Sequence, residues 1–424
     1  MSLPVLLSLM AEPLTGLADT AFVARLGAEY LAALGAGTVA LSSIFWVFNF
    51  LGIGTQTEMA QAYGRQEQNR MAEIGGLAIA VSAGIGGLLI LGGLLTVPYV
   101  ATVMGADGAV HNFASRYIQA RLFGGPAVLV SLAAFGILRG LQDMRTPFWV
   151  AVSINFLNIV LDPLLIFGYG PFPQLGIFGA GLASVISQWL GALWAVAVVL
   201  RRLGFPNHLR MGDIIKLFQI GRDLFVRTGL LLAFFIFTTR AATRISPDAG
   251  AAHQAIRQVW VLTALFLDAY AITGQSLIGF FIGPARLAQA RRVARLVCIW
   301  SVATGIFLSA VMALGQNLVV WLLLPPSATK IFLAAWWMAV ISQPLNALAF
   351  ATDGIHWGTG DFRYLRNVMI SATTIGGMAI YLLDETVSGA LTRIWLITAF
   401  WIAIRALFGV LRIWPGIGKS PLKK

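Results

Sequence analysis

Long apolar runs alternate with short polar connections along almost the whole chain. A helix of about 20 apolar residues crosses the hydrocarbon core of a bilayer, and each run with its connection averages roughly 35 residues here. The pattern therefore predicts an all-α polytopic membrane protein with twelve transmembrane helices. The expected spans lie near residues 3–24, 31–60, 73–98, 114–138, 147–168, 177–200, 214–242, 250–281, 289–314, 330–352, 365–383 and 391–413.

The most polar long connection, RRLGFPNHLRMGD at residues 201–213, separates six spans from six. We therefore predict an N-terminal six-helix bundle over 1–203 and a C-terminal bundle over 204–424. The halves also align as repeats. An offset of 219 residues pairs Thr20, Arg25, Ala32, Ala33, Ala36, Gln56 and Gly64 with Thr239, Arg244, Ala251, Ala252, Ala255, Gln275 and Gly283, and an offset of 218 pairs Pro126, Gly136, Gly140 and Asp143 with Pro344, Gly354, Gly358 and Asp361. Six spans per half predict a pseudo-twofold axis along the membrane normal, with a substrate path between the bundles.

Composition and charge agree with a membrane location. The chain is 58% hydrophobic and 11% charged, whereas soluble domains carry about 25% charged residues. The net charge of +12 would also suit nucleic acid, but Lys and Arg concentrate in alternate connections, as the positive-inside rule predicts. We therefore expect no nucleic-acid partner, and we expect both termini to be cytoplasmic. We also expect a monomer in the plasma (cell inner) membrane. The single Cys298 excludes an internal disulfide.

The fifth span carries unusual polarity for its depth in the membrane. Asn155, Asn158 and Asp162 fall at i, i+3 and i+7, so a helix places them on one face. Pro163 follows directly and lacks an N–H, which leaves the carbonyl of Ile159 without its helical donor. Ionisable residues within a membrane span are rare and usually functional. We therefore predict an ion or substrate site on this face.

The first span holds a second polar group, in the stretch AEPLTGLADTAF. Asp19 shares a helical face with Glu12, and Pro13 before it provides a point at which the helix can bend. The depth argument favours a functional role for Asp19, whereas Glu12 could equally lie at a helix end in water. The repeat supports an ion site in the first half, because Thr238, Gly376 and Ile380 stand where the repeat aligns Asp19, Asn158 and Asp162.

Other polar and aromatic residues within the spans are weaker candidates, each with an alternative structural role. A path between the bundles should be largely apolar and aromatic, with one acidic wall, which would suit lipophilic cations. The candidates for this path are Phe45, Trp46, Asn49, Trp260, Asp268, Gln275 and Asp353. Arg227, His253 and Arg257 could either serve such a site or extend to the membrane interface.

Nothing in the sequence indicates an enzyme, a cofactor or a structural metal site. There is no P-loop and no evident pairing of a nucleophile with a base. The histidines at 111, 208, 253 and 356 lack the spacing of metal ligands.

Three stretches resemble the signature regions of the multidrug and toxic compound extrusion (MATE) family. They are EPLTGLADTAFVARLGAEYLAALG, RGLQDMRTPFWVAV and NFLNIVLDPLLIFGYG. Two further segments, RDLFVRT at 222–228 and LFLDAYA at 265–271, resemble its DinF-like branch.

The resemblance implies a secondary antiporter that exports organic compounds in exchange for H⁺ or Na⁺, built from two six-helix bundles. It also implies a first-half ion site, which falls on Asp19, Asn158, Asp162 and Ser184 in this sequence. A carboxylate pair in a dry site titrates readily, so we favour H⁺, although the same oxygens could hold Na⁺. A lipid-linked flippase of related architecture is the alternative, but a lipid headgroup would require a basic cavity.

Overall fold

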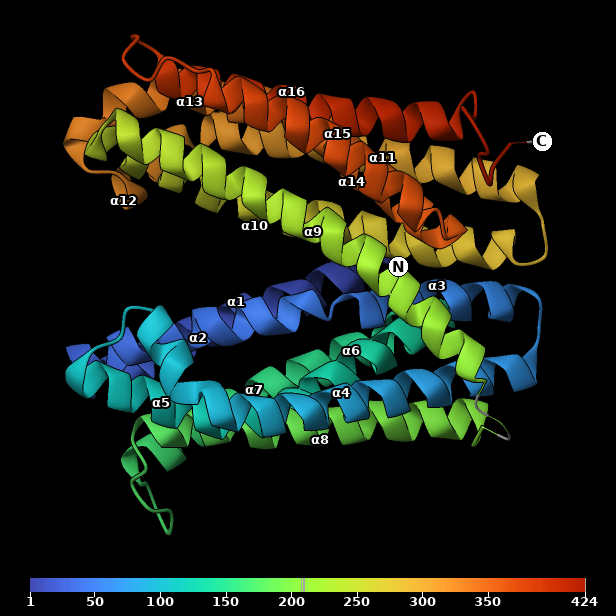
Figure 1. The fold of residues 1–424 in the computed structure, drawn as a ribbon, viewed down its shortest axis with the longest axis horizontal. Helices are drawn as coiled ribbons and strands as arrows, with labels where there is room; N and C mark the ends of the chain where they lie inside the picture. Colours follow the sequence, from blue (N-terminus) through green and yellow to red (C-terminus); the bar gives the residue numbers. More distant parts are fainter. Residues whose placement is uncertain (207, 209, 424) are drawn as a thin grey trace. The chain divides into compact units, whose positions relative to one another are not determined.

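The computed structural model describes residues 1–206, 208 and 210–423, except for the side chains of Glu12 and Met211. The expectation about Glu12 therefore lies outside the described side chains. All regular structure in the described part of the chain is helical (Figure 1). The helices are α1 (Ser2–Ala24), α2 (Ala28–Val47), α3 (Phe50–Gly64), α4 (Gln68–Val103), α5 (Gly108–Leu122), α6 (Gly125–Gly140), α7 (Arg145–Phe167), α8 (Ile177–Leu203), α9 (Met211–Ile245), α10 (Pro247–Ile282), α11 (Leu287–Leu314), α12 (Gln316–Leu323), the short 3₁₀ helix η1 (Pro326–Ala328), α13 (Thr329–Ile341), α14 (Gln343–Thr359), α15 (Phe362–Tyr381) and α16 (Ala390–Ile413).

Each of the twelve predicted spans lies on helix, which confirms the all-α membrane fold. Eight candidate spans among the described residues are long and apolar enough to cross a membrane, and two bent pairs of helices raise the number to ten. The remaining two predicted spans correspond to α9 and α15.

The bent pairs are a repeated feature that the sequence pattern did not predict. Helix α5 meets α6 at 47° and α13 meets α14 at 44°. The breaks at Gly124 and Ser342 are related by the repeat offset of 218 residues. Pro126 and Pro344 begin the helices that follow, and their missing N–H groups cannot bond to the preceding turn. The repeat therefore includes the bends as well as the spans.

Close backbone contacts at glycines are also repeated. A Cβ added to Gly136 on α6 would lie 2.4 Å from the carbonyl oxygen of Gly52 on α3. The repeat equivalents of these two residues are Gly354 on α14 and Ala271 on α10, where an added Cβ would lie 2.2 Å from the carbonyl oxygen. Small residues allow helices to approach closely in a membrane, where apolar burial provides little driving force for association.

Contacts divide the chain into two compact units, one of Met1 and Leu3–Gly221 and the other of Ser2 and Arg222–Lys424. The sequence placed the boundary at 203/204, in the connection before α9, whereas the contact division falls inside α9. The first turns of α9 are held on the first unit by ion pairs. Arg70 donates two hydrogen bonds to Asp213, at 2.6 and 2.7 Å, and Lys216 Nζ lies 2.7 Å from Glu58 Oε2.

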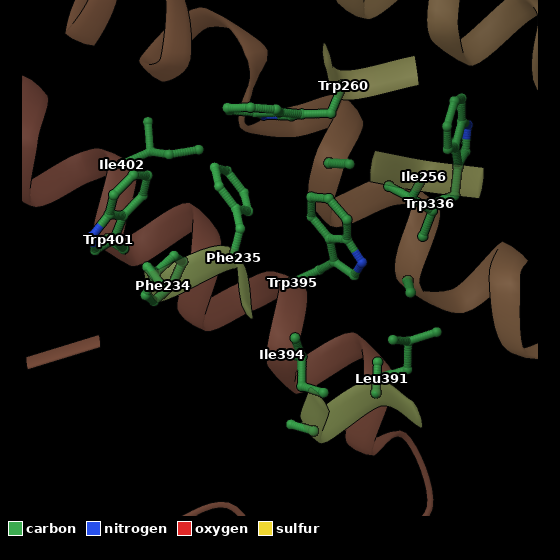
Figure 2. Close-up of a cluster of buried hydrophobic side chains, with 14 of the residues drawn as sticks. Phe234, Phe235, Ile256, Trp260, Trp336, Leu391, Ile394, Trp395, Trp401 and Ile402 are labelled. Carbon is green, nitrogen blue, oxygen red and sulfur yellow. The ribbon is translucent and has the colours of Figure 1, made fainter. Parts of the chain in front are cut away.

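The second unit has a large aromatic core, which Figure 2 shows in part. The rings of Phe234 and Trp401 stack with centroids 4.6 Å apart, and Phe235 packs against Trp260 at 5.1 Å. Trp395 and Trp336 are fully buried in the same cluster. This core joins α9, α10, α13 and α16.

The connection between α6 and α7 contains a helix cap and a pair of charges. Asp143 accepts hydrogen bonds from the backbone N–H groups of Arg145 and Thr146, at 3.0 and 2.9 Å, and from the Thr146 hydroxyl. The guanidinium of Arg202 lies 2.6 Å away. Burial raises the pKa of this carboxyl group, but the bonds from Thr146 and the charge of Arg202 outweigh that effect and lower the pKa overall. In the second unit the repeat equivalent, Asp361, is bonded by Arg412.

Replacing Asp143 with alanine should lower the stability of the folded protein by about 1 kcal/mol, because an N-terminal helix cap is lost. Because the folded-state pKa is depressed, this contribution is present above the ordinary carboxyl pKa of about 3.9 and disappears as the pH falls through the folded value. Thermal unfolding in detergent at neutral and acidic pH measures the effect. Asp107→Ala is the control, since Asp107 precedes α5 without a side-chain cap bond. Equal melting temperatures for the two variants at neutral pH would contradict the prediction.

Candidate functional site

Helices α1 and α7 are joined inside the first unit by polar contacts at two levels. At the first level the Thr15 hydroxyl donates to Asn155 Oδ1. The amide nitrogen of Asn155 donates to the carbonyl of Ala151 at 2.7 Å, which fixes the orientation of the amide. The sequence predicted that Asn155 belongs to the polar face of this span, and the structure places it there.

The second level lies about one helical turn further along both helices. It contains Asp19 from α1, Asn158 and Asp162 from α7, and Ser184 from α8. With its nitrogen turned toward α1, the Asn158 amide donates to Asp19 Oδ1 at 3.1 Å and accepts from the Ser184 N–H at 3.3 Å. In the opposite orientation its nitrogen reaches Asp162 Oδ1 at 3.5 Å and Ser184 Oγ at 3.4 Å. The structure therefore brings together the four residues that the resemblance named.

The two carboxyl groups of this cluster are neighbours, and the Asn158 amide can reach either of them. Asp162 on α7 is 0% exposed, and Asp19 on α1 is partly exposed. If both carboxyl groups are ionised, neither of them can donate a hydrogen bond. Asp162 Oδ2 then accepts no hydrogen bond from the described residues. A single proton placed between the groups satisfies both, because it supplies the donor and removes the repulsion of two buried charges. The arrangement is compatible with a proton-binding carboxyl pair, and the role of the pair in ion coupling stays a prediction.

An arginine near this pair was missed in the sequence analysis. Arg121 lies in the last turn of α5, and its charge interacts with both Asp19 and Asp162. Its Nη1 donates to Gln188 Oε1 on α8 at 2.9 Å. The only sequence signal was a basic residue inside the expected span 114–138, which no argument from spacing linked to the acidic residues. Arg121 therefore places a positive charge near the carboxyl pair.

Pro13 lies inside α1, which continues as helix on both sides of it. It precedes Thr15 and Asp19, so a bend at Pro13 would move the residues that contact α7. Its role as a hinge stays a prediction.

The first-unit candidates for a substrate path lie around the junction of α2 and α3. Phe45 is half-buried against the hydrophobic cluster of α2 and α5, and Trp46 is 47% exposed. Asn49 is exposed and immediately precedes α3. These positions are compatible with a lining role, which stays a prediction.

The second-unit candidates are mostly interior. Trp260 is 5% exposed within the aromatic core, and Gln275 is 0% exposed beside Gly358. Asp268 is half-buried on α10. Asp353 is buried between two arginines, Arg227 of α9 and Arg405 of α16. The assignment of these residues to a substrate path also stays a prediction.

Many apolar helices, internal duplication and a buried carboxyl pair together are typical of membrane transporters. Comparisons with known proteins identify the group. A family profile described as MatE matches residues 4–164. The chain is 31% identical to "Protein DETOXIFICATION 44, chloroplastic" of Arabidopsis thaliana over 430 residues, covering 97% of this chain and 81% of that protein. It is 29% identical to the "DNA damage-inducible protein F" of Escherichia coli over 420 residues, covering 96% and 89%.

A solved structure described as "Crystal structure of MATE in the bent conformation" has the same fold, with a TM-score of 0.89 at 20% identity over 98% of this chain and 94% of that one. The chain belongs to the multidrug and toxic compound extrusion family, as a DinF-like member. It is therefore a multi-pass membrane efflux transporter.

Proposed function

We propose that this transporter exports organic compounds in exchange for protons, and that the pair formed by Asp19 and Asp162 binds the proton. The observation that supports the proposal is the proximity of two carboxyl groups, one of them fully buried, which one proton satisfies. Sodium is the alternative ion, because the oxygens of Asp19, Asn158, Asp162 and Ser184 are ligands of the kind that Na⁺ prefers.

The proposed coupling step is the response of α1 to protonation. Protonating the pair removes a repulsive charge and strengthens the contact between α1 and α7. If that contact is tighter in a bent form of α1, proton binding shifts the population toward the bent form. Pro13 lowers the cost of that bend, because its helix position already lacks one hydrogen bond. Shrinkage of the space beside the pair would then release the substrate outside.

The proposed substrates include lipophilic cations, which the acidic pair can attract while it is deprotonated. Competition for the same negative charge makes the binding of a cation and of a proton mutually exclusive, which is the requirement for exchange. Transport, and not catalysis, is the proposed activity.

Purified protein in proteoliposomes tests this proposal. With ethidium as the substrate, an imposed pH gradient should drive ethidium accumulation against the ethidium concentration gradient. A Na⁺ gradient at uniform pH should not drive it. Accumulation driven by Na⁺ alone would identify the alternative ion. Ethidium movement that is independent of both gradients would refute ion-coupled exchange.

The proposed orientation places both termini and the connection after α8 in the cytoplasm. Single cysteines at Arg201 and Gln174, both exposed, should then react with an impermeant maleimide from opposite sides of the membrane. A Cys298→Ala background removes the native thiol. Inside-out and right-side-out vesicles provide the two sides. Labelling of both positions from the same side would contradict the proposed topology.

A further inference from the structure

Three charged side chains meet inside the second unit. Asp353 Oδ2 accepts hydrogen bonds from Arg227 Nη2 and from Arg405 Nη2, the latter at 2.8 Å. The exposed fractions of the side chains are 7% for Asp353, 9% for Arg227 and 3% for Arg405. Two guanidinium groups and one carboxylate carry a net charge of +1. A buried charge without a counter-charge is costly, so this cluster is one negative charge short of balance.

The same two arginines also carry unpaired hydrogen-bond donors. Arg227 Nε and both Nε and Nη1 of Arg405 are buried and have no hydrogen-bond partner among the described residues. Arg412, on the same helix as Arg405, provides a contrast. Its Nε donates to Asp361, its Nη1 to the Ile417 carbonyl and its Nη2 to the Lys419 carbonyl, each at 2.7 Å. The fold can therefore satisfy a buried arginine on α16 completely, and it does not do so at Arg405.

Aromatic rings border the cluster. Arg405 lies 4.6 Å from the ring centre of Trp401, and Arg227 lies 5.2 Å from that of Trp357. Phe234 stacks on Trp401 and extends the apolar surface (Figure 2). The ring faces attract the cations, but they do not accept the in-plane N–H groups of the guanidinium. The unpaired guanidinium donors therefore lie beside aromatic side chains.

The cluster is not a requirement of the repeated architecture. The offsets that align the two halves place Ser8 opposite Arg227 and Phe135 opposite Asp353. By contrast, Asp143 and Asp361, which the offset of 218 aligns, are each paired with an arginine in the last turn of a helix, Arg202 of α8 and Arg412 of α16. Features that packing demands recur in both units, whereas the Arg227–Asp353–Arg405 cluster occurs in one.

We propose that Arg227 and Arg405 form a binding site for an organic carboxylate with an aromatic or otherwise apolar body. The planar fork of a guanidinium matches the two oxygens of a carboxylate, which gives short, charge-assisted hydrogen bonds. Asp353 holds the two guanidinium groups in place, and the carboxylate supplies the missing negative charge. This inference rests on the proposed export function and adds a class of substrate to it, recognised in the second unit and not at Asp19 and Asp162.

Equilibrium binding to the purified protein in detergent tests the site without requiring transport. The probe is 1-naphthoate, and its methyl ester and 1-naphthylmethylammonium serve as the neutral and cationic counterparts. Naphthoate should bind at least about tenfold more tightly than either, because only it can accept both charge-assisted bonds. Chloride at equal concentration should compete poorly. Equal affinity for naphthoate and its ester, or complete displacement by equimolar chloride, would overturn the proposal.

Variants then assign the residues. Arg405→Gln leaves Asp353 paired with Arg227 and should weaken naphthoate binding roughly ten- to a hundredfold. Arg405→Lys keeps the charge but loses the fork, so its affinity should fall between those of Arg405→Gln and the unchanged protein. Arg412→Gln is the matched control and should bind as the unchanged protein does. Unaltered affinity in Arg405→Lys and in a folded Arg405→Gln would contradict the assignment.

The outcome is separable from that of the proposed exchange. Asp162→Asn should bind naphthoate normally, because Asp162 lies in the first unit. Failure of naphthoate binding would leave proton-driven export intact as a proposal, and failure of proton coupling would leave the carboxylate site standing.

Discussion

Replacing Asp162 with asparagine should reduce proton-driven export to the level of cells that lack the transporter. Asparagine keeps the size of the side chain and can bond to Asp19, but it cannot hold or release a proton. Asp162 is fully buried, and it is the acidic neighbour of Asp19 in the carboxyl pair. Asp19 alone lacks the second carboxyl group with which it would share a proton, so the substitution should remove coupling and not merely weaken it. Retention of ethidium by cells expressing equal amounts of each protein measures the effect.

The control for this experiment is Asp384→Asn. Asp384 lies in the connection between α15 and α16, and its carboxylate accepts from Thr386 at the surface. Its export should equal that of the unchanged protein. Because a neutral amide in place of the buried carboxylate relieves a repulsion, Asp162→Asn should melt no lower than the unchanged protein. Normal export by a folded Asp162→Asn protein would show that the proton binds elsewhere.

The largest expected effect on stability comes from Gly354→Ala. The added Cβ would lie 2.2 Å from the carbonyl oxygen of Ala271, so α10 and α14 must separate. Overpacking of this kind costs about 1–3 kcal/mol and sometimes more, and here the obstacle is backbone, which cannot rotate away. Gly136→Ala meets the carbonyl of Gly52 at 2.4 Å and should be destabilised similarly. Thermal unfolding in detergent gives the comparison.

Gly87→Ala on α4 is the matched control, since an added Cβ there has no atom within 4 Å. Alanine is favoured over glycine in helices by up to about 1 kcal/mol, so this variant should melt at the same temperature or slightly higher. If Gly354→Ala melted like Gly87→Ala, the close contact between α10 and α14 would not be required for stability.

The fold was largely predictable because each span is a local property of the sequence. About 20 apolar residues in succession identify a span without reference to other parts of the chain. The repeat offset added the relation between Gly136 and Gly354, which the structure places in equivalent contacts. The bends at Gly124 and Ser342 were not predicted, since Pro126 and Pro344 were interpreted as parts of continuous spans. The division of units inside α9 depends on ion pairs between distant residues, such as Arg70 and Asp213.

The acidic residues of the candidate site were predictable because charged residues are rare within membrane spans. Asp19 and Asp162 were identified because a carboxylate at membrane depth is costly, and the spacing of Asn158 placed it on the same face. Arg121 could not be connected to them, because its proximity depends on how α5 packs beside the pair. The sequence analysis did not decide whether Arg227 and Asp353 belong to a functional site or have a structural role, such as extending to the membrane interface. Their pairing requires the packing of α9, α14 and α16, which no local pattern specifies.

Proton movement driven by substrate tests the central claim most directly, namely that one proton at the Asp19–Asp162 pair exchanges for substrate. Proteoliposomes containing a trapped pH indicator would be given an ethidium gradient, with no pH gradient and no Na⁺. Exchange predicts that protons move in the direction opposite to ethidium, and that Asp162→Asn abolishes the pH change. Ethidium flux in the unchanged protein without any pH change, or an undiminished pH change in Asp162→Asn, would contradict the claim.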